Sequence, residues 1–286
     1  MKKFVYRFLI LAVSIFVAQF VLYIGIKYVL DSKSKFRLTR YFRNSKHDYY
    51  ILGNSRAVNS VNEKYANDSL KLDLINLGFN GEPYKNIVDL LDDINSKVTH
   101  KTIFFEVSCI TKAKTDYSYA YYIANSKFIK KDYSNTIYDK IALLRFNNEF
   151  FIRNIFYLNK SDNNWINNGT ITPAIINEID TIKSATIFHN NTVDFEKRMV
   201  EIAAKCAKSN NKVVFYLAPY FPKYLARISD YNYTLNFFKT NAGKYNFVDM
   251  NNVQLTQSMF MDKIHSNITA APILTRYLMD TSKTLQ

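Results

Sequence analysis

The sequence predicts an α/β fold, a parallel sheet covered by helices, that follows a single N-terminal transmembrane helix. An uncharged run of 19 residues, Phe8–Ile26, stands near the start of the chain. Beyond it, short apolar runs alternate with segments whose apolar residues recur at helical spacing. That alternation is typical of a parallel, doubly wound sheet. The chain has 286 residues, of which 48% are hydrophobic, so it suits one sizeable domain with an insertion.

The run Phe8–Ile26 is interpreted as a retained signal anchor. A membrane-spanning helix needs roughly 20 apolar residues, whereas a cleaved signal peptide has a shorter apolar core and then a small-residue cleavage site. No convincing site of that kind follows the run. We therefore assign residues 1–30 to a cytoplasmic tip and a transmembrane signal anchor, and residues 31–47 to a basic juxtamembrane linker.

Charge alone does not settle the side of the membrane on which the main domain lies. Basic residues precede the anchor, and residues 33–46 contain six more without an acidic residue. Short basic flanks tend to stay in the cytoplasm, but long domains cross the membrane largely regardless of charge. The basic segment also suits an anionic lipid surface. Both orientations stay open on these grounds.

The elements of the main domain, residues 48–286, follow in order. Tyr49–Gly53 is an apolar run that stops at a glycine, as a buried parallel strand does. Residues 59–70 are mostly polar and predict a short helix or a loop. Tyr84–Val98 has apolar residues at the spacing of an amphipathic helix. Further strands are predicted at Leu72–Leu77, Thr102–Val107, Lys212–Ala218 and Tyr245–Asp249, and further helices at Val193–Ser209, Leu225–Phe238 and Ala271–Met279.

An insertion at about residues 112–190 interrupts this rhythm. Asp132–Asn159 carries apolar residues on one helical face, so the insertion is expected to be mainly helical. Trp165 follows in a polar loop, where it either shapes a substrate pocket or packs as an ordinary loop aromatic.

Composition narrows the choice of partners. The net charge is +14, but the lysines are spread along the chain and match no nucleic-acid-binding motif, so we expect no nucleic-acid partner. A membrane surface, anionic glycans or a plain solvated lysine-rich surface account for the charge. Cys109 and Cys206 lack the spacing of a metal site, so neither a metal nor a cofactor is expected. The two thiols either form a disulfide or are both buried and free.

Ser55 lies where a ligand-binding residue of such a sheet would lie. It directly follows the first predicted strand, and ligands bind at the carboxyl edge of open α/β sheets. Serine needs an adjacent base to act as a nucleophile. His47 and His100 precede strands and so lie at the opposite edge, and His189 lies in a polar loop. His265, after the last strand, is at the same edge as Ser55.

Asp262 precedes His265 by three residues, so one helical turn would place both on one face. The acid could then orient the imidazole and stabilise its cation. Each residue also has a plainer explanation, because a serine after a glycine is most often a turn residue. The conjunction of an early serine with a late acid and histidine favours a catalytic set.

With these residues the sequence resembles an SGNH (GDSL-type) hydrolase over roughly residues 48–110 and 193–280. The matching blocks are Gly53-Asn54-Ser55, Asn76-Leu77-Gly78 and Asp262–His265. The resemblance implies a flavodoxin-like three-layer α/β/α sandwich with Ser55 as nucleophile, His265 as general base and Asp262 as its orienting acid. It further implies that the backbone N–H groups of Ser55 and Gly78 bind the oxyanion.

The sequence departs from the family pattern at two places. Asn54 stands where an aspartate is usual, and Glu106-Val107-Ser108-Cys109 stands where a Gly-x-Asn-Asp block is expected. The side-chain oxyanion donor of that block is therefore missing unless Asn80 replaces it. Arg56, next to the serine, either contacts an anionic substrate or forms a structural salt bridge.

The serine block, the anchor and the missing block are together similar to the DltD-like and AlgJ/AlgX-like branches. That similarity implies a serine esterase or O-acyltransferase outside the cytoplasmic membrane. Its partners would be the membrane, an acylated cell-envelope polysaccharide or related polymer, and a membrane-bound O-acyltransferase. Two other hypotheses stay open, a non-catalytic scaffold or glycan-binding accessory protein with this fold, and a nucleophile at Cys109.

Overall fold

The computed structural model describes residues 2–81, 84–110, 155–159, 166–188 and 192–285. The chain divides into two compact units. One unit contains residues 1–44 and 117–162, and the other contains residues 45–116 and 163–286. The sheet and all the residues of the candidate site belong to the second unit, so each unit is described by itself.

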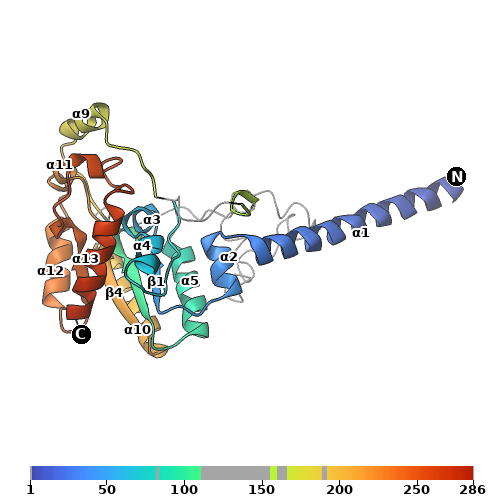
Figure 1. Ribbon diagram of the computed structural model, residues 1–286, viewed down its shortest axis with the longest axis horizontal. Helices are drawn as coiled ribbons and strands as arrows, with labels where there is room; N and C mark the ends of the chain where they lie inside the picture. The colour runs from blue at the N-terminus through green and yellow to red at the C-terminus, as the bar shows by residue number, and fades with distance from the viewer. Residues whose placement is uncertain (1, 82–83, 111–154, 160–165, 189–191, 286) are drawn as a thin grey trace. The chain divides into compact units, whose positions relative to one another are not determined.

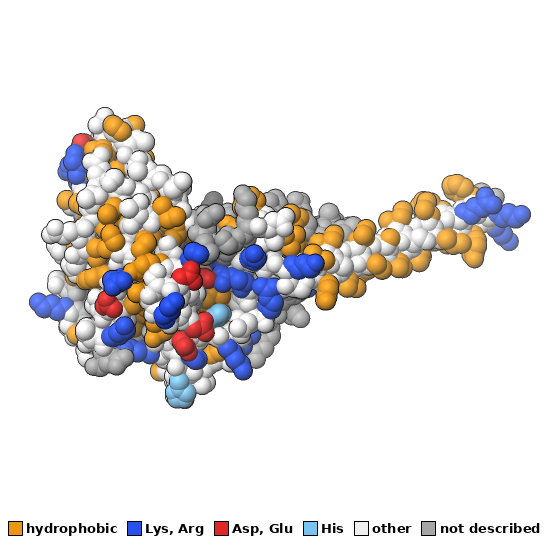
Figure 2. Space-filling view, viewed as in Figure 1, with side chains coloured by type: hydrophobic (Ala, Val, Ile, Leu, Met, Phe, Trp, Pro, Cys, Tyr) orange, Lys and Arg blue, Asp and Glu red, His pale blue; other side chains and the backbone are white. Residues whose placement is uncertain are grey.

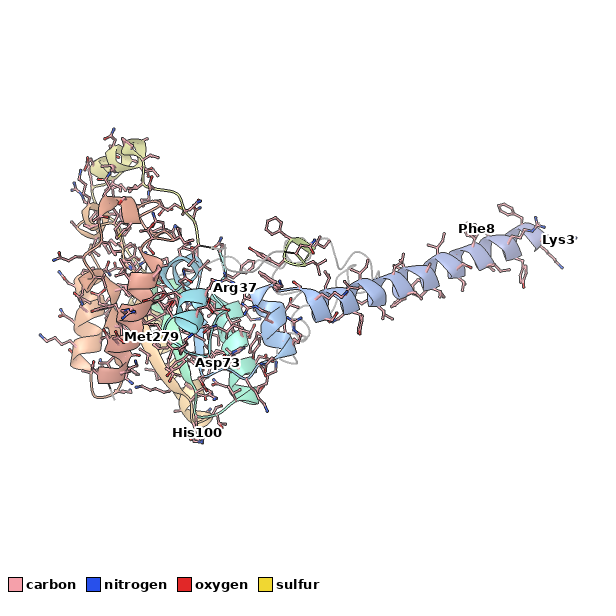
Figure 3. All side chains as sticks on the ribbon, in the orientation of Figure 1. Lys3, Phe8, Arg37, Asp73, His100 and Met279 are labelled. Atoms are coloured by element: carbon pink, nitrogen blue, oxygen red, sulfur yellow. The ribbon has the colours of Figure 1, made fainter. Side chains whose placement is uncertain are left out.

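The first unit begins with α1 (Lys2–Lys33), which contains the predicted anchor. This helix has 32 residues, and the mean hydropathy of its most apolar window is 2.5, with none of that window buried. Figure 2 shows hydrophobic side chains along α1 and basic side chains at its N-terminal end, where Figure 3 labels Lys3 and Phe8. The helix is therefore long and apolar enough to cross a membrane, as the sequence predicts.

The basic segment after the anchor contains a helix, α2 (Arg37–Arg43), where we predicted a linker. The guanidinium of Arg43 donates to the backbone carbonyls of Asp31, Ser32 and Ser34. The last carbonyls of a helix have no partner within the helix, so these bonds satisfy the C-terminal end of α1. Part of the basic charge thus serves the fold of this unit.

Five parallel strands form the sheet of the second unit (Figure 1). The strands are β1 (Tyr49–Leu52), β2 (Leu74–Asn76), β3 (Thr102–Glu106), β4 (Lys212–Leu217) and β5 (Asn246–Asp249). Their order in the sheet is β2-β1-β3-β4-β5, and every adjacent pair is parallel. The predicted α/β fold with a parallel sheet is confirmed. Because the sheet grows in opposite directions from β1, the carboxyl ends of β1 and β3 flank the point where such sheets bind ligands.

Helices cover both faces of this sheet. The helices α3 (Ser55–Ser60), α4 (Glu63–Asp68) and α13 (Ala271–Thr284) pack together on one face, and α5 (Tyr84–Lys97), α10 (Thr192–Lys208) and α12 (Tyr231–Thr240) cover the other. Shorter helices are α9 (Pro173–Thr181), α11 (Pro222–Leu225), η1 (Val107–Ile110), η4 (Met250–Asn252) and η5 (Gln257–Met259).

The strand residues alternate between the two helical layers. Ile51, Phe104 and Val214 pack in one core cluster with Leu274 and Leu278 of α13. On the other face, Phe215 contacts Phe105 of β3 and Phe238 of α12 through their rings. Each such side chain contributes roughly 1.5–3 kcal/mol when it is fully buried. This burial on both faces explains why the strands read as continuous apolar runs.

The helix predicted over Leu225–Phe238 is wrong as a single element, because the chain forms α11 and α12 there. Between them Ile228 pairs with Ala185 in a parallel bridge. The carboxylate of Asp230 accepts the backbone N–H groups of Ile187 at 2.7 Å and Phe188 at 2.9 Å. Tertiary hydrogen bonds therefore override a periodicity that is locally helical.

The insertion is described only in part. It contains α9, which agrees with a helical character. The helix predicted over Asp132–Asn159 lies outside the described residues except for residues 155–159, and Trp165 lies outside them as well.

Candidate active site

The turn between β1 and α3 places Ser55 at the carboxyl edge of the sheet. Asn54 is the N-cap of α3, and its side chain accepts the backbone N–H of Arg56 at 2.9 Å. Gly53 has a φ of 153°, and a Cβ there would lie 2.7 Å from Glu106 Cβ and 2.8 Å from Ala57 Cβ. Only glycine fits this close approach. The hydroxyl of Ser55 therefore leaves the sheet at a fixed point.

Ser55, His265 and Asp262 form a continuous hydrogen-bonded chain. The Nε2 atom of His265 lies 2.7 Å from Ser55 Oγ, although the two residues are 210 positions apart. The Nδ1 atom of the same ring lies 2.8 Å from Asp262 Oδ2. With the ring proton on Nδ1, the imidazole donates to Asp262 and accepts from the Ser55 hydroxyl. The geometry is that of a nucleophile, a base and a group that orients the base.

The loop that carries His265 is closed by Asp262 rather than by a helical turn. Asp262 Oδ1 accepts the backbone N–H of Ile264 at 2.8 Å and that of His265 at 2.9 Å. Our prediction of one helical turn is wrong in its backbone, because the carboxylate itself makes the turn. Both oxygens of Asp262 are thus used, one for the loop and one for the ring.

The environment of Asp262 favours its charged form. Burial opposes ionisation, but the hydrogen bond and the charge of His265, together with the two backbone N–H groups, outweigh it and lower the pKa of this carboxyl. Asp262 is therefore a carboxylate at neutral pH. It can stabilise the imidazolium that forms when His265 takes a proton.

The expected oxyanion donors differ in whether they already have a hydrogen-bond partner. Ser55 is the first residue of α3, and no acceptor for its backbone N–H lies among the described residues. The N–H of Gly78 donates to Asn76 Oδ1 at 3.0 Å. The side chain of Asn76 is fixed in turn, because its amide donates to the carbonyl of Ala57 in α3 and to that of Val61 just after α3. Asn80 is exposed, and no contact among the described residues joins it to Ser55.

A buried carboxylate occupies the place of the missing third block. Glu106 ends β3 and is fully buried. Its oxygens accept from the Ser108 hydroxyl at 2.6 Å, from the Ser108 N–H at 3.1 Å and from the Ala218 N–H at 3.3 Å. The Ser108 side chain is thus held by its neighbour Glu106. The sequence signal for this network was a lone acid at the end of an apolar strand.

Arg56 forms the structural salt bridge that was one of its two predicted roles. Its Nε atom lies 3.4 Å from Glu106 Oε1, and the exposed fractions of the two side chains are 3% and 0%. A guanidinium buried in this way does not face solvent, so a direct contact with an anionic substrate has no support.

The cysteines are buried, and they are free rather than linked as a disulfide. Burial raises the pKa of the Cys109 thiol well above its ordinary value and that of Cys206 to about 12. A nucleophilic cysteine needs a lowered pKa. The hypothesis of a nucleophile at Cys109 therefore loses its support.

The other histidines lie away from Ser55, as far as the structure describes them. The Nδ1 atom of His47 lies 2.6 Å from Asp73 Oδ1. His47 precedes β1, and Asp73 precedes β2. His100 lies in the turn that precedes β3, and Figure 3 shows it at the end of the sheet where these strands begin. His189 lies outside the described residues. Among the residues described, no group of three or more His, Cys, Asp and Glu side chains forms a metal site.

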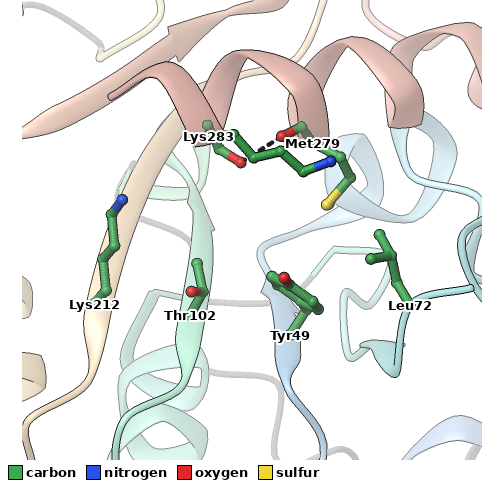
Figure 4. Close-up of a pocket in the computed structure, with 7 residues that line it drawn as sticks. Tyr49, Leu72, Thr102, Lys212, Met279 and Lys283 are labelled. Atoms are coloured by element: carbon green, nitrogen blue, oxygen red, sulfur yellow. Dashed lines mark hydrogen bonds between the residues drawn. The ribbon is translucent and has the colours of Figure 1, made fainter. Parts of the chain in front are cut away.

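A small hollow lies at the amino-terminal edge of the sheet (Figure 4). Tyr49, Thr102 and Lys212, the first residues of three adjacent strands, line it beneath α13. Its only drawn hydrogen bond runs from the Ser282 hydroxyl to the Met279 carbonyl, at 2.8 Å. No histidine or carboxylate lines the hollow. It is therefore separate from the candidate active site.

Comparisons with models of known protein families and with curated proteins found no match to this chain.

Proposed function

We propose that this chain is a membrane-anchored serine esterase or O-acyltransferase that acts on acyl esters of cell-envelope glycans or related polymers. The observation that carries the proposal is the hydrogen-bonded chain from Ser55 through His265 to Asp262, at the carboxyl edge of a parallel sheet. The strand order β2-β1-β3-β4-β5 supports it, since this is the order of flavodoxin-like folds. We propose an SGNH-type arrangement on the same basis.

In this mechanism His265 Nε2 takes the proton of the Ser55 hydroxyl as Oγ attacks the ester carbonyl carbon. The tetrahedral intermediate places its oxyanion at the Ser55 N–H. The C–O bond to the alcohol then breaks, and His265 returns the proton to the departing oxygen, which leaves an acyl-serine. Water or a sugar hydroxyl attacks the acyl-serine in the second step, with His265 again as base. Water gives a free acid, and a hydroxyl gives a new ester.

Asp262 has two roles in the proposal. It keeps the proton of the neutral ring on Nδ1, so that Nε2 is free to accept. It also stabilises the imidazolium of each tetrahedral stage, for which its lowered pKa keeps it charged. The Gly78 N–H becomes a second oxyanion donor when a substrate oxygen replaces Asn76 Oδ1 as its acceptor. One such donor is worth about 3–4 kcal/mol of transition-state stabilisation in acyl transfer.

The anchor supports the membrane part of this proposal, and the resemblance to enzymes of the cell envelope supports the polymer substrate. The helix α1 is compatible with insertion in the cytoplasmic membrane, and we propose that the sheet-bearing unit faces outward. A polymer acylated by a membrane-bound O-acyltransferase would then meet Ser55 on the outer side of the membrane. An active alkaline phosphatase fused after residue 286 would support this orientation, and an inactive fusion in a stable protein would contradict it.

A non-catalytic scaffold or glycan-binding accessory protein is the second candidate. Two observations favour it. The Gly78 N–H already donates to Asn76, and β3 ends at a buried glutamate, Glu106, in place of an amide donor. A protein that kept the fold without acyl transfer could tolerate such an oxyanion site.

Labelling with a fluorophosphonate decides between the two. The full chain in native membranes should be labelled, and Ser55→Ala should lose all labelling. Ser282→Ala is a matched control, because it removes a hydroxyl from α13 at the opposite edge of the sheet and should keep the wild-type rate. Equal labelling of wild type and Ser55→Ala would rule out Ser55 as the nucleophile. A folded wild type that is not labelled would favour the scaffold.

A further inference from the structure

Arg56, the residue after Ser55, forms a buried ion pair with Glu106. The guanidinium also stacks on Tyr220, with its central carbon 3.5 Å from the ring centroid. Burying two charges removes their hydration, and well-packed apolar residues would often be at least as stable. The stability of the fold therefore gives a weak reason for this pair. Its hydrogen bonds point to a different role.

The remaining donors of Arg56 reach two segments that are distant in sequence. Nη1 donates to the carbonyl of Ile264 at 3.0 Å, and Nη2 donates to the carbonyl of Ala218. Ile264 directly precedes His265, and Ala218 directly follows β4. Arg56 itself follows Ser55 in α3. One guanidinium thus connects the turn of the nucleophile, the end of β4 and the loop of the base.

Glu106 keeps the guanidinium in this orientation from the other side. Its Oε1 atom accepts from both Arg56 Nε and the Ala218 N–H. The backbone of Ala218 is therefore held by both members of the pair, its N–H by Glu106 and its carbonyl by Arg56. Glu106 makes no hydrogen bond to Ile264, so Arg56 is the member of the pair that reaches the base loop. The same loop is also held by the Ser266 hydroxyl, which donates to the Asn59 carbonyl of α3 at 3.0 Å, and by the Lys263 carbonyl, which accepts the Phe221 N–H at 3.1 Å.

We propose that Arg56 is a positioning residue that holds the His265 loop in register with Ser55, with Glu106 as its fixed counter-charge. The inference rests on the proposed function, because the alignment of His265 with Ser55 matters only if the two residues act together in catalysis. The planar fork of arginine suits the task, since it presents several donors in fixed directions, whereas a lysine ammonium is a flexible point charge. A displacement of about 1 Å in a catalytic group can cost roughly 100-fold in rate.

Four variants separate positioning from stability. Arg56→Met leaves a buried charge on Glu106, so it should lower both the thermal midpoint and the fluorophosphonate labelling rate. The double variant Arg56→Met/Glu106→Gln removes both charges, so the midpoint should return toward wild type while labelling stays about 100-fold slow. Arg56→Lys should label at an intermediate rate. The control Lys205→Met/Asp92→Asn removes an ion pair of 2.8 Å between α10 and α5 and should label normally.

Recovery of both the midpoint and the labelling rate in the double variant would overturn the proposal, because the pair would then be purely structural. If the double variant does not fold, Arg56→Lys carries the test. A wild-type labelling rate in a folded Arg56→Lys protein would also overturn it.

A spectroscopic measurement tests the positioning without any activity. The chain has four histidines, so selective ¹⁵N labelling gives a short set of ring signals, and a His265→Gln variant assigns the one of interest. The Nδ1–H signal of His265 should be present in wild type and should shift or broaden in the double variant. An unchanged signal would overturn the proposal. A wild type that shows this signal but no labelling would contradict the proposed function and leave the positioning intact.

Discussion

The two edges of the sheet are built from the same strands but hold different kinds of groups. At the carboxyl edge, the segments that follow β1 and β5 supply a serine and an Asp–His pair, and the last residue of β3 is a buried glutamate. At the amino-terminal edge, the same layer of strands begins with Tyr49, Thr102 and Lys212 around a small hollow. The two edges of the sheet therefore hold different kinds of side chains.

The difference between the two edges lies in the side chains that they bring together. No histidine or carboxylate lines the hollow, whereas Ser55, His265 and Asp262 are joined by hydrogen bonds at the carboxyl edge. The reason is the direction of the chain. All strands are parallel, so the loops that leave them meet at one edge, where they bring together residues far apart in the sequence. The following predictions test this contrast, from the largest expected effect to the smallest.

The largest effect is expected from removing the nucleophile or the base. Ser55→Ala and His265→Ala should each lower kcat/KM for a soluble acyl ester by about 10⁴-fold or more, because a nucleophile and its base act as a unit. The double variant should be no worse than either single variant. Ester hydrolysis by the purified full chain measures this effect. Additive losses in the double variant would show that the two residues act separately.

The next effect is expected from Asp262→Asn, at about 10³–10⁴-fold in kcat. Oδ1 is committed to the backbone N–H groups of Ile264 and His265. The new amide nitrogen would therefore face His265 Nδ1 and donate to it. The ring would carry its proton on Nε2, where it cannot accept from Ser55. Steady-state kinetics and the ¹⁵N ring signals check the rate and the tautomer together, and an unchanged kcat would contradict the assignment.

At the opposite edge the expected effect is on stability alone. Met279 is 2% exposed, so Met279→Ala should lower the free energy of unfolding by about 2–5 kcal/mol. The fluorophosphonate labelling rate of the folded protein should not change. Lys283→Ala, at the exposed rim of the hollow, should change stability by less than about 0.5 kcal/mol. Loss of labelling in a folded Met279→Ala protein would connect the two edges and contradict the contrast.

The smallest effect is the pH dependence of the contribution of Asp262 to stability. Its folded-state pKa is lower than the ordinary value of 3.8, so the unfolded chain binds more protons in that pH range. The stabilisation is then fully present above the ordinary value and disappears as the pH falls through the lowered one. Urea unfolding of wild type and Asp262→Asn should differ most near neutral pH and least in acid. A difference that grows toward low pH would contradict the sign.

The sequence by itself determined the elements that depend on local pattern. The apolar runs such as Tyr49–Gly53 became strands, and Phe8–Ile26 lies in one long helix, because side-chain periodicity and length are local properties. The direction of parallel strands then placed Ser55 and His265 at one edge. That inference needs only the chain order of the strands and the loops that follow them.

Only the tertiary structure decided the connections between these elements. The Arg56–Glu106 pair joins residues 50 positions apart, and it requires β1 to lie beside β3, which no local pattern specifies. The break before α12 and the turn made by Asp262 likewise depend on hydrogen bonds to partners whose position follows from the packing. A local pattern can place the serine, but the register of the groups around it is a property of the assembled sheet.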